Sequence, residues 1–210
     1  MIPEKQRYEN LEKFTPDVVG RYDIPVIRAD KVNFSDLIGF NYAATAKDRA
    51  KKAVHFFLDD YQFFRVWNRP RDYINTLSQF ACVLSPDFSL YTDFPVAMQI
   101  YNHYRKHWLG AYWQSFGIKV IPTICWSDER SFDWCFDGEP VGGVVAVSSV
   151  GTQNSRTAKA AFLRGYEAMC ERLSPSEIIF YGSVPDECRG NIIHVKSFQD
   201  KFKEARTNGW

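Results

Sequence analysis

Acidic residues follow three consecutive apolar runs of the chain and are its clearest candidates for chemistry. Asp59 and Asp60 come directly after AVHFFL, Asp87 follows FACVL, and Asp128 follows IKVIPTIC. Grouped carboxylates bind hard cations such as Mg²⁺ or Mn²⁺, which can polarise a phosphoryl or carbonyl oxygen. Two carboxylates in different surroundings can instead divide the roles of acid and base. These four aspartates are therefore the predicted catalytic set.

Each of these aspartates also has a purely structural interpretation. An aspartate in front of a helix accepts backbone N–H bonds, which stabilise the helix by about 1 kcal/mol. Asp93, ahead of Phe94 and Pro95, is typical of such a cap. For Asp59, Asp60 and Asp87 taken together, the cap and the catalytic interpretation both remain open.

Small polar and aromatic residues lie in the same loops and form a predicted ligand-binding set. The segment SSVGTQNSRT at 148–157 lies between an apolar run and a helical stretch, so its N–H groups could hold a phosphate. It lacks the P-loop lysine and the GxGxxG spacing, so an ordinary loop is the competing interpretation. The predicted ligand-binding residues are Ser85, Ser89, Tyr91, Trp126, Ser149, Gly151, Thr152, Gly182 and Ser183.

Short apolar runs alternate with helical stretches and would position these residues. Several runs are continuously apolar, as in a parallel sheet that is buried on both faces. Alternating strands and helices predict an α/β fold with a mostly parallel sheet and crossover helices, either a partial (β/α) barrel or an open doubly wound sheet. In both, ligands bind at the carboxyl ends of the strands. The predicted strands lie at 36–40, 53–58, 80–84, 118–125, 142–149, 177–182 and 191–195.

Two long helices and two short ones are predicted between the strands. Residues 94–117 place Val96, Ile100, Tyr104 and Trp108 on one face, and residues 156–175 form the second long helix. Shorter helices are expected in TAKDRAKKA and RPRDYINTLSQ. The last connection, SVPDECRG, is too short for a helical crossover, so the final strand is expected to be antiparallel or to lie at an edge.

Three further groups of residues have a structural interpretation as well as a functional one. His103 and His107 are four residues apart and could chelate a metal, but Arg105 and Lys106 between them and the lack of an HExxH glutamate favour a solvated helix face. The thiols of Cys82 and Cys125 are expected to be inert core groups. Arginines 65, 69 and 71 with Trp67 could hold a phosphate and stack a base, although a surface helix start explains them equally well.

Composition indicates a soluble globular protein. Of the 210 residues, 45% are hydrophobic and 24% are charged, and the net charge of +1 does not support long-range attraction to nucleic acid or membrane. Five scattered cysteines, with no apolar signal or spanning segment, predict reduced thiols in a cytoplasmic protein. Residues 1–23 are expected to be an N-terminal arm and residues 24–210 a single α/β domain.

Long segments of the chain also carry a family resemblance. VHFFLDDYQFFRVW, SPDFSLYTDFPVAMQIYNHYR, LGAYWQSFGIKVIPTICWSDERSFDWCF, GGVVAVSSVG and IIFYGSVPDE resemble the family called domain of unknown function 4417, found in phage, plasmid and bacterial proteins. The match spans roughly residues 24 to 195 and implies a phage or mobile-element context. It carries over no catalytic residue.

Two functional hypotheses follow from the sequence. The first is a small-molecule or nucleotide site at the carboxyl ends of the strands, in a metal-assisted hydrolase or transferase that uses Mg²⁺ or Mn²⁺. The second is a non-catalytic module that binds nucleic acid or another protein, motivated by the aromatic and arginine content. The sequence leaves open whether the protein is an enzyme.

Overall fold

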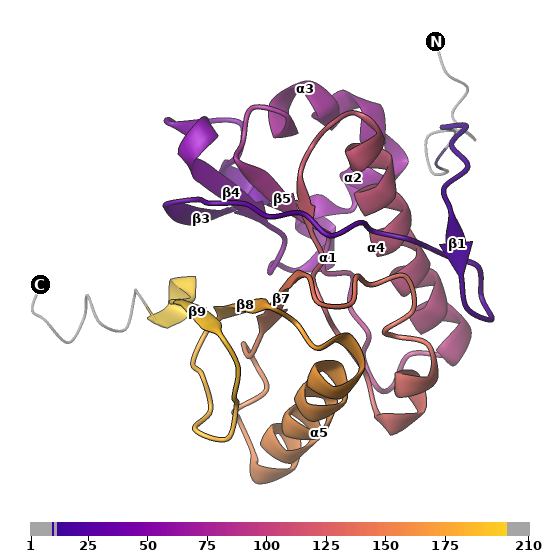
Figure 1. The fold of residues 1–210 in the computed structure, drawn as a ribbon, viewed down its shortest axis with the longest axis vertical. Coiled ribbons are helices and arrows are strands. Elements are labelled where there is room, and N and C mark those ends of the chain that lie inside the picture. The colour runs from indigo at the N-terminus through magenta and orange to yellow at the C-terminus, as the bar shows by residue number, and fades with distance from the viewer. Residues whose placement is uncertain (1–9, 11, 201–210) are drawn as a thin grey trace, which may run out of the picture.

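A computed structural model describes residues 10 and 12–200 of the chain (Figure 1). An antiparallel pair, β1 and β2, precedes the parallel strands, and β3 is the first of these. The elements are β1 (Val18–Val19), β2 (Ile24–Pro25), β3 (Asp36–Gly39), β4 (Lys52–His55), α1 (Asp60–Phe63), α2 (Arg65–Asn68), α3 (Ile74–Leu77), β5 (Cys82–Leu84), α4 (Val96–Ser115), β6 (Val120–Ile121), β7 (Val144–Ser148), α5 (Arg156–Leu173), β8 (Glu177–Tyr181) and β9 (Ile192–Val195), with 3-10 turns at 40–42, 49–51, 70–73 and 129–133.

The parallel strands lie side by side in chain order. Strands β3, β4, β5 and β6 form one sheet, and β7, β8 and β9 form another. A parallel bridge between Thr123 and Ala146 joins the two, because the N–H of Ala146 donates to the carbonyl of Pro122 at 2.8 Å and the N–H of Ile124 donates to the carbonyl of Ala146 at 2.7 Å. The result is one continuous parallel sheet without a reversal of strand order. A doubly wound sheet needs such a reversal, so the structure selects the barrel-like alternative.

Alternating residues along each strand show that the sheet curls on itself. One set of side chains packs into a single cluster that draws on both ends of the sheet: Leu37, Ala53, Cys82, Leu84, Ile121, Val144, Ala146, Ile179 and Tyr181. Their neighbours in sequence, such as Val54, Val83 and Val145, face the opposite way into other clusters. Side chains of distant strands meet in this way only on the concave face of a curved sheet. The strands thus form a partial barrel, open between β3 and β9 among the described residues.

Helices cover the outer face of this partial barrel in two groups. The long helix α4 and the short helices α1 to α3 pack against β4, β5 and β6 through one core that includes Phe56, Trp108 and Trp113. Helix α5 packs against β7 and β8 through a second core that includes Phe162 and Phe180. Figure 1 shows α5 on one side of the strands and α4 on another. Both faces of the strands are therefore buried, which explains their continuously apolar sequences.

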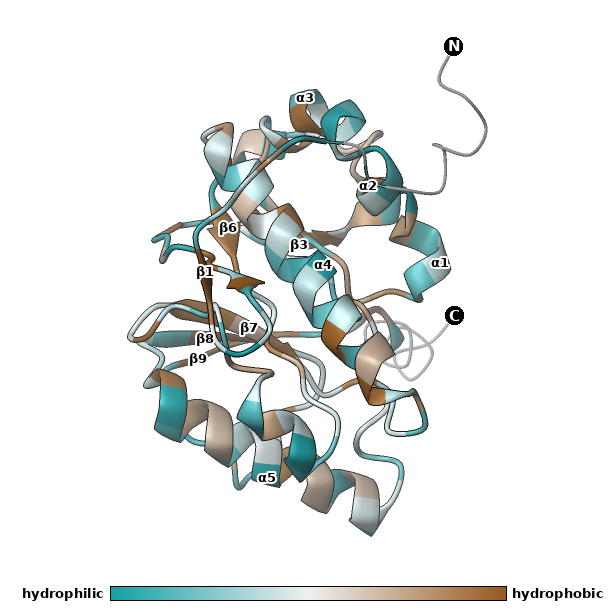
Figure 2. Cartoon of the chain, turned by 90° about the vertical axis from the view of Figure 1, so that its right-hand side faces the viewer, coloured by the Kyte–Doolittle hydropathy of each residue, from teal (hydrophilic) through white to brown (hydrophobic). Residues whose placement is uncertain are grey.

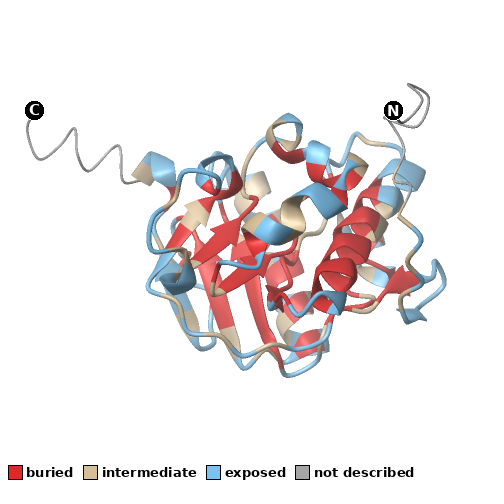
Figure 3. Ribbon diagram, turned by 90° about the horizontal axis from the view of Figure 1, so that it is seen from above, coloured by how far each residue is buried: buried red, intermediate tan, exposed pale blue. Residues whose placement is uncertain are grey.

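Helix α4 is buried although many of its residues are polar. Figure 2 shows hydrophilic positions along α4, and Figure 3 shows that buried residues occupy the strands and helices of the interior. His103 and His107 are 1% and 0% exposed, so the expected solvated helix face at these residues is wrong. Val96, by contrast, is exposed, because the first turn of α4 extends beyond the core. Hydrophobic spacing could not reveal this, since residues from distant segments supply hydrogen bonds to many of the polar side chains of α4.

Some predicted elements differ from the structure. The helix expected in TAKDRAKKA is only a 3-10 turn at Arg49–Lys51, followed at once by β4. Asp93 does not cap α4, whose N-cap is Pro95 without a side-chain hydrogen bond. The final strand β9 lies at the edge, as expected, but is parallel to β8, because a loop without helix suffices for the crossover.

The predicted N-terminal arm lies partly outside the described residues. Within the described part, Phe14 packs edge to face against Trp108 and Tyr112 of α4, at ring distances of 5.6 and 5.5 Å. Glu12 pairs with Arg71 at 2.7 Å. This segment is therefore held against the outer helical layer. Among the described residues, helices that combine enough length and apolar character to cross a membrane are absent.

Candidate functional site

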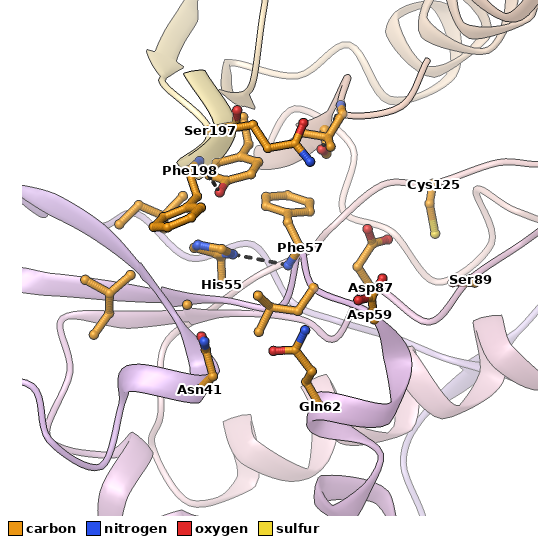
Figure 4. Close-up of a pocket in the computed structure, with 18 of the residues that line it drawn as sticks. Asn41, His55, Phe57, Asp59, Gln62, Asp87, Ser89, Cys125, Ser197 and Phe198 are labelled. Atoms are coloured by element: carbon orange, nitrogen blue, oxygen red, sulfur yellow. Dashed lines mark hydrogen bonds between the residues drawn. The ribbon is translucent and has the colours of Figure 1, made fainter. Parts of the chain in front are cut away.

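A cavity of about 790 Å³ opens at the carboxyl ends of the parallel strands (Figure 4). Its lining comes from the exits of β3, β4, β5, β7, β8 and β9 and from the loop that follows Thr123. It also extends along β3 to the segment 196–199, across the open side of the partial barrel. We call it the strand-end cavity. Its position follows from the fold, because parallel strands bring their outgoing loops together at one edge.

Five of the predicted site residues line the strand-end cavity. They are Asp59, Asp87, Ser89, Tyr91 and Trp126. Figure 4 shows Asp59 and Asp87 close together, with Cys125 next to Asp87. The side chain of Asp59 is exposed and that of Asp87 is half-buried. The structure thus brings two carboxylates from successive strand exits into one space, and their surroundings differ.

The other two predicted catalytic acids have structural partners instead. The carboxylate of Asp60 accepts bonds from the backbone N–H of Ser89 at 3.2 Å and from its hydroxyl at 2.8 Å. Asp128 caps the 3-10 turn at 129–133 by accepting the N–H of Arg130, and it pairs with the guanidinium of Arg130 at 2.6 Å. Neither lines the cavity. The cap interpretation is therefore confirmed for Asp128.

The remaining predicted ligand-binding residues lie just outside the cavity lining. Ser85 is buried and bonds Thr123, which fixes the end of β5 to the loop that joins the two sheets. The hydroxyl of Ser149 donates to the carbonyl of Ser183 at 2.7 Å. The hydroxyl of Thr152 donates to the carbonyl of Ser149, and Gly151 and Gly182 both have positive φ. In this region the lining residues are Ser148 and Val150, not the predicted ones.

Several lining residues were missed by the sequence reasoning. His55 and Tyr181 are the last residues of β4 and β8, and their rings lie 4.7 Å apart across the barrel interior. The alternation of side chains along each strand could have identified both residues, because a residue two positions after an inward-facing one also faces inward. Asn41, Gln62 and Lys196 also line the cavity. They lie after the strands, where periodicity carries no information.

The predicted strand at 118–125 is too long at Cys125. Strand β6 ends at Ile121, and Cys125 lines the cavity, while the expectation of an inert thiol is not contradicted. Its thiol forms a hydrogen bond with the carboxylate of Asp87. Burial raises the pKa of Cys125 well above the ordinary value, so the thiol stays protonated and can donate this bond.

The electrostatic environment sets Asp87 apart from Asp59. Burial raises the pKa of Asp87 to about 6, against the lowering effects of Lys106 and of the Cys125 thiol. A carboxyl group with a pKa near 6 can both release and accept a proton close to neutral pH. Asp87 can therefore exchange a proton with a ligand in the cavity near neutral pH.

One wall of the cavity depends on a close approach between a loop and α5. Trp126 packs beside Phe162 of α5, with ring centroids 5.4 Å apart. A Cβ atom at Gly165 would lie 2.1 Å from the indole nitrogen of Trp126. Only glycine leaves room for the ring at this position of the helix, so Gly165 sets the position of the Trp126 wall.

The cavity acids do not form a ready-made metal centre. Within the described residues, three or more His, Cys, Asp or Glu side chains come close enough to share an ion at His103, His107 and Glu139, which lie on and beside α4. Of the four predicted catalytic aspartates, Asp59 and Asp87 line the cavity, and Asp36 at the start of β3 lines it as well. A Mg²⁺ ion there would need water or ligand oxygens to complete its coordination.

The arginine and tryptophan patch is occupied by contacts within the protein. Trp67 is 7% exposed and packs edge to face on Trp108 at 5.5 Å, so its ring is not available to stack a base. Arg71 pairs with Glu12, and the guanidinium of Arg65 lies 5.2 Å from the ring centre of Phe40. These contacts favour the structural interpretation of the patch.

Comparison with known proteins places the chain in a family. Residues 16–199 match the family described as Domain of unknown function (DUF4417). The chain belongs to the DUF4417 family. The resemblance stated from the sequence is thus confirmed. The DUF4417 match ends at residue 199, and Gln199 is the last residue of the cavity lining, so the whole strand-end cavity lies within the matched segment.

Two phage proteins are similar to this DUF4417 chain. The Gene 1 protein of Mycobacterium phage L5 is 41% identical over 174 residues, which cover 82% of this chain and 76% of the phage protein. The Gene 1 protein of Mycobacterium phage D29 is 37% identical over 198 residues, which cover 90% and 72% respectively. No solved structure matches the chain. The similarity supports a phage origin, and neither name states an activity, so the function is argued from the cavity.

Proposed function

We propose that the protein binds a small polar molecule with a flat ring, of the nucleoside or nucleotide class, in the strand-end cavity. The observation that carries this proposal is the composition of the lining. Aromatic rings from Phe57, Tyr91, Trp126 and Tyr181 stand beside carboxylates and amides. Rings provide flat apolar contact, while carboxylate and amide oxygens accept bonds from hydroxyl and amino groups. A nucleoside presents both kinds of surface.

The acids of the cavity support a reaction as well as binding. Asp87, with its pKa raised by burial, is proposed as the group that exchanges a proton with the ligand. Asp59, exposed and a few residues from the end of β4, is proposed to bind hydroxyl groups of the ligand or to activate water. Hydrolysis or group transfer needs these two roles.

A metal-assisted version of the same reaction applies if the ligand carries phosphates. Mg²⁺ is usually bound by one or two carboxylates together with substrate phosphates and water. Asp59 and Asp87 could supply those carboxylates, and the ligand would bring the remaining oxygens. The two versions differ in whether binding needs Mg²⁺ or Mn²⁺.

Thermal-shift and calorimetric titrations test the proposal. The wild-type chain is titrated with a panel of nucleosides and nucleotides, each with and without Mg²⁺, because a tight ligand raises the melting temperature by mass action. We expect at least one member to bind, and Asp87→Asn and Asp59→Asn to weaken that binding at least about 10-fold, a loss of roughly 1.4 kcal/mol. Nucleoside binding without Mg²⁺ supports the acid–base version, and nucleotide binding that needs Mg²⁺ supports the metal-assisted version.

Asp128→Asn is the matched control, because Asp128 is an aspartate of a strand-exit loop that lies outside the cavity. It should leave ligand affinity unchanged. If no member of the panel binds, or if Asp128→Asn weakens binding as much as Asp87→Asn, the proposed site is wrong.

A further inference from the structure

Two histidines and a glutamate form a buried cluster away from the strand-end cavity. His103 and His107 lie on successive turns of α4, and their ring centroids are 4.4 Å apart. Glu139 reaches them from the loop before β7. The three residues are 1%, 0% and 8% exposed, and their ligand atoms lie within 4.8 Å of one another. We call them the His–Glu cluster.

Backbone carbonyls determine which nitrogen of each histidine carries a proton. The Nε2 atom of His103 lies 3.1 Å from the carbonyl oxygen of Asp137, and the Nδ1 atom of His107 lies 2.8 Å from that of Pro25. A carbonyl oxygen only accepts, so both of these nitrogens must be N–H donors. In the neutral ring the other nitrogen then carries a lone pair.

Two atoms of the cluster lack partners, and a third contact depends on a cation. His107 Nε2 lies 2.9 Å from Oε1 of Glu139, and because Nδ1 of the same ring already donates to Pro25, this contact needs either a second ring proton or a metal ion. His103 Nδ1 and Glu139 Oε2 are buried and have no hydrogen-bond partner within the described part of the chain. Buried polar atoms without partners destabilise a fold. Nitrogen and oxygen atoms from three buried side chains thus converge, and two of these atoms have no hydrogen-bond partner.

We propose that His103, His107 and Glu139 hold a divalent first-row transition-metal ion of the zinc type. A metal ion between them would bind His107 Nε2 and the two unpartnered atoms, His103 Nδ1 and Glu139 Oε2, at once. Metal-binding histidines usually donate their second N–H to a carbonyl or carboxylate, as both rings do here. Two imidazoles with one carboxylate suit zinc and related ions, whereas Mg²⁺ and Ca²⁺ prefer oxygen ligands alone.

Lys106 limits how the glutamate can bind the ion. Its ammonium group is buried and donates to Oε1 of Glu139 at 2.7 Å and to the carbonyl of Thr123 at 2.8 Å. Lys106 therefore takes one carboxylate oxygen, and Oε2 is left for the ion. Zinc bonds of about 2.0–2.2 Å place tetrahedral ligand atoms roughly 3.3–3.5 Å apart, so small side-chain movements complete the site.

The loop that carries Glu139 is shaped to reach the cluster. Gly138 has a φ of +77°, and a Cβ atom there would lie 2.4 Å from the carbonyl oxygen of Pro25 and 2.7 Å from Nδ1 of His107. The ion would tie α4 to this loop, and the carbonyl of Pro25 would tie both to β2. None of the three proposed ligands lines the strand-end cavity, so the metal site and the proposed ligand site are made of different residues.

Metal analysis and cobalt substitution test the proposal. The full chain is produced without a histidine tag, and its zinc content is measured after extensive dialysis. The metal-stripped protein is then titrated with Co²⁺ and with Zn²⁺ against a competing chelator, with Mg²⁺ as a comparison. We expect one equivalent of zinc per chain and a visible Co²⁺ spectrum of the tetrahedral type without thiolate bands, because the proposed ligands include no cysteine.

His103→Gln and Glu139→Gln remove proposed ligands, and His194→Gln is the matched control, since His194 is an exposed histidine on β9. Loss of an outer-shell partner lowers metal affinity 10–100-fold, so loss of a ligand should lower it at least about 100-fold, while His194→Gln leaves it unchanged. Circular dichroism shows whether each variant is folded, and the wild-type cobalt spectrum tests the site even if a variant is not.

Three results would overturn the proposal. One is wild-type protein that neither retains zinc nor develops a Co²⁺ spectrum. Another is a Co²⁺ spectrum dominated by thiolate bands, which would place the ion on cysteines. The third is folded His103→Gln protein with wild-type zinc affinity, because the cluster would then be held by a proton shared between His107 and Glu139 instead of by an ion.

Discussion

The hydroxyl of Ser89 donates a hydrogen bond of 2.8 Å to the carboxylate of Asp60, and the backbone N–H of Ser89 donates a second at 3.2 Å. These bonds join the segment after β4 to the segment after β5, at the edge where the strand-end cavity opens. Asp59, the neighbouring residue, has an exposed side chain that lines the cavity. The two adjacent aspartates therefore have different surroundings, since Asp60 is hydrogen-bonded within the protein and Asp59 lines the cavity.

The first prediction separates these two aspartates. Asp60→Ala should lower the free energy of unfolding by about 1–3 kcal/mol, because it leaves the half-buried Ser89 donors without their charged acceptor. Asp59→Ala should change stability by less than about 0.5 kcal/mol, as expected for an exposed site. Urea denaturation of the two variants measures both values. Equal destabilisation by the two substitutions would contradict the assignment.

The second prediction concerns the rings that meet inside the partial barrel. Phe57 stacks on Tyr181 at a centroid distance of 5.0 Å and an interplanar angle of 19°, so the segment after β4 touches β8 across the concave face. Phe57→Ala should destabilise the fold by about 2–4 kcal/mol through lost burial and lost ring contact. Tyr61→Ala is the control, because Tyr61 is 79% exposed. Denaturation curves for both variants show whether the loss is specific to Phe57.

The third prediction is a pH dependence that comes from Asp87. Burial raises its pKa in the folded protein to about 6, above the value near 3.8 expected in the unfolded chain. Between these values the folded state keeps a proton that the unfolded state releases, so the stability contributed by the protonated group is lost as pH rises through about 6. Asp87→Asn should therefore be more stable than wild type at pH 8 by about 1–3 kcal/mol and nearly equal to it at pH 4.

Unfolding measurements at both pH values test this sign. Asp128→Asn should behave in the opposite way, because hydrogen bonds from Arg130 lower the pKa of Asp128 and its contribution is lost as pH falls. A difference between wild type and Asp87→Asn that does not change from pH 4 to pH 8 would show that burial does not shift this carboxyl group.

The fourth prediction concerns the wall formed by Trp126. Gly165→Ala places a methyl group 2.1 Å from the indole nitrogen of Trp126, so the ring or the helix must move. We expect a loss of about 1–3 kcal/mol in stability and a shift in tryptophan fluorescence. Ala160→Ser, at an exposed position of α5, should change neither. An unchanged fluorescence spectrum in Gly165→Ala would mean that the indole is not held against the helix.

The sequence by itself determined the α/β class, the parallel strands and the edge at which the cavity opens. Apolar runs such as 144–148 and 177–181 bury both faces, and loops long enough for crossovers separate most of them, so parallel pairing was the consistent solution. That rule was enough to place Asp59, Asp87 and Trp126 at one cavity. It could not separate Asp59 from Asp60, because adjacent residues point in different directions once the chain leaves a strand.

Tertiary structure alone decided the curvature of the sheet and the burial of the polar residues on α4. Strand order depends on long-range pairing, and the bridge between Thr123 and Ala146 joins the two sets of strands into one curved sheet. His103 and His107 looked solvated because polarity in a sequence does not report burial. Their partners, the carbonyl groups of Asp137 and Pro25 and the carboxylate of Glu139, come from distant segments. Such partners become neighbours only when the chain has folded. Their hydrogen bonds then offset the free-energy cost of burying the polar rings.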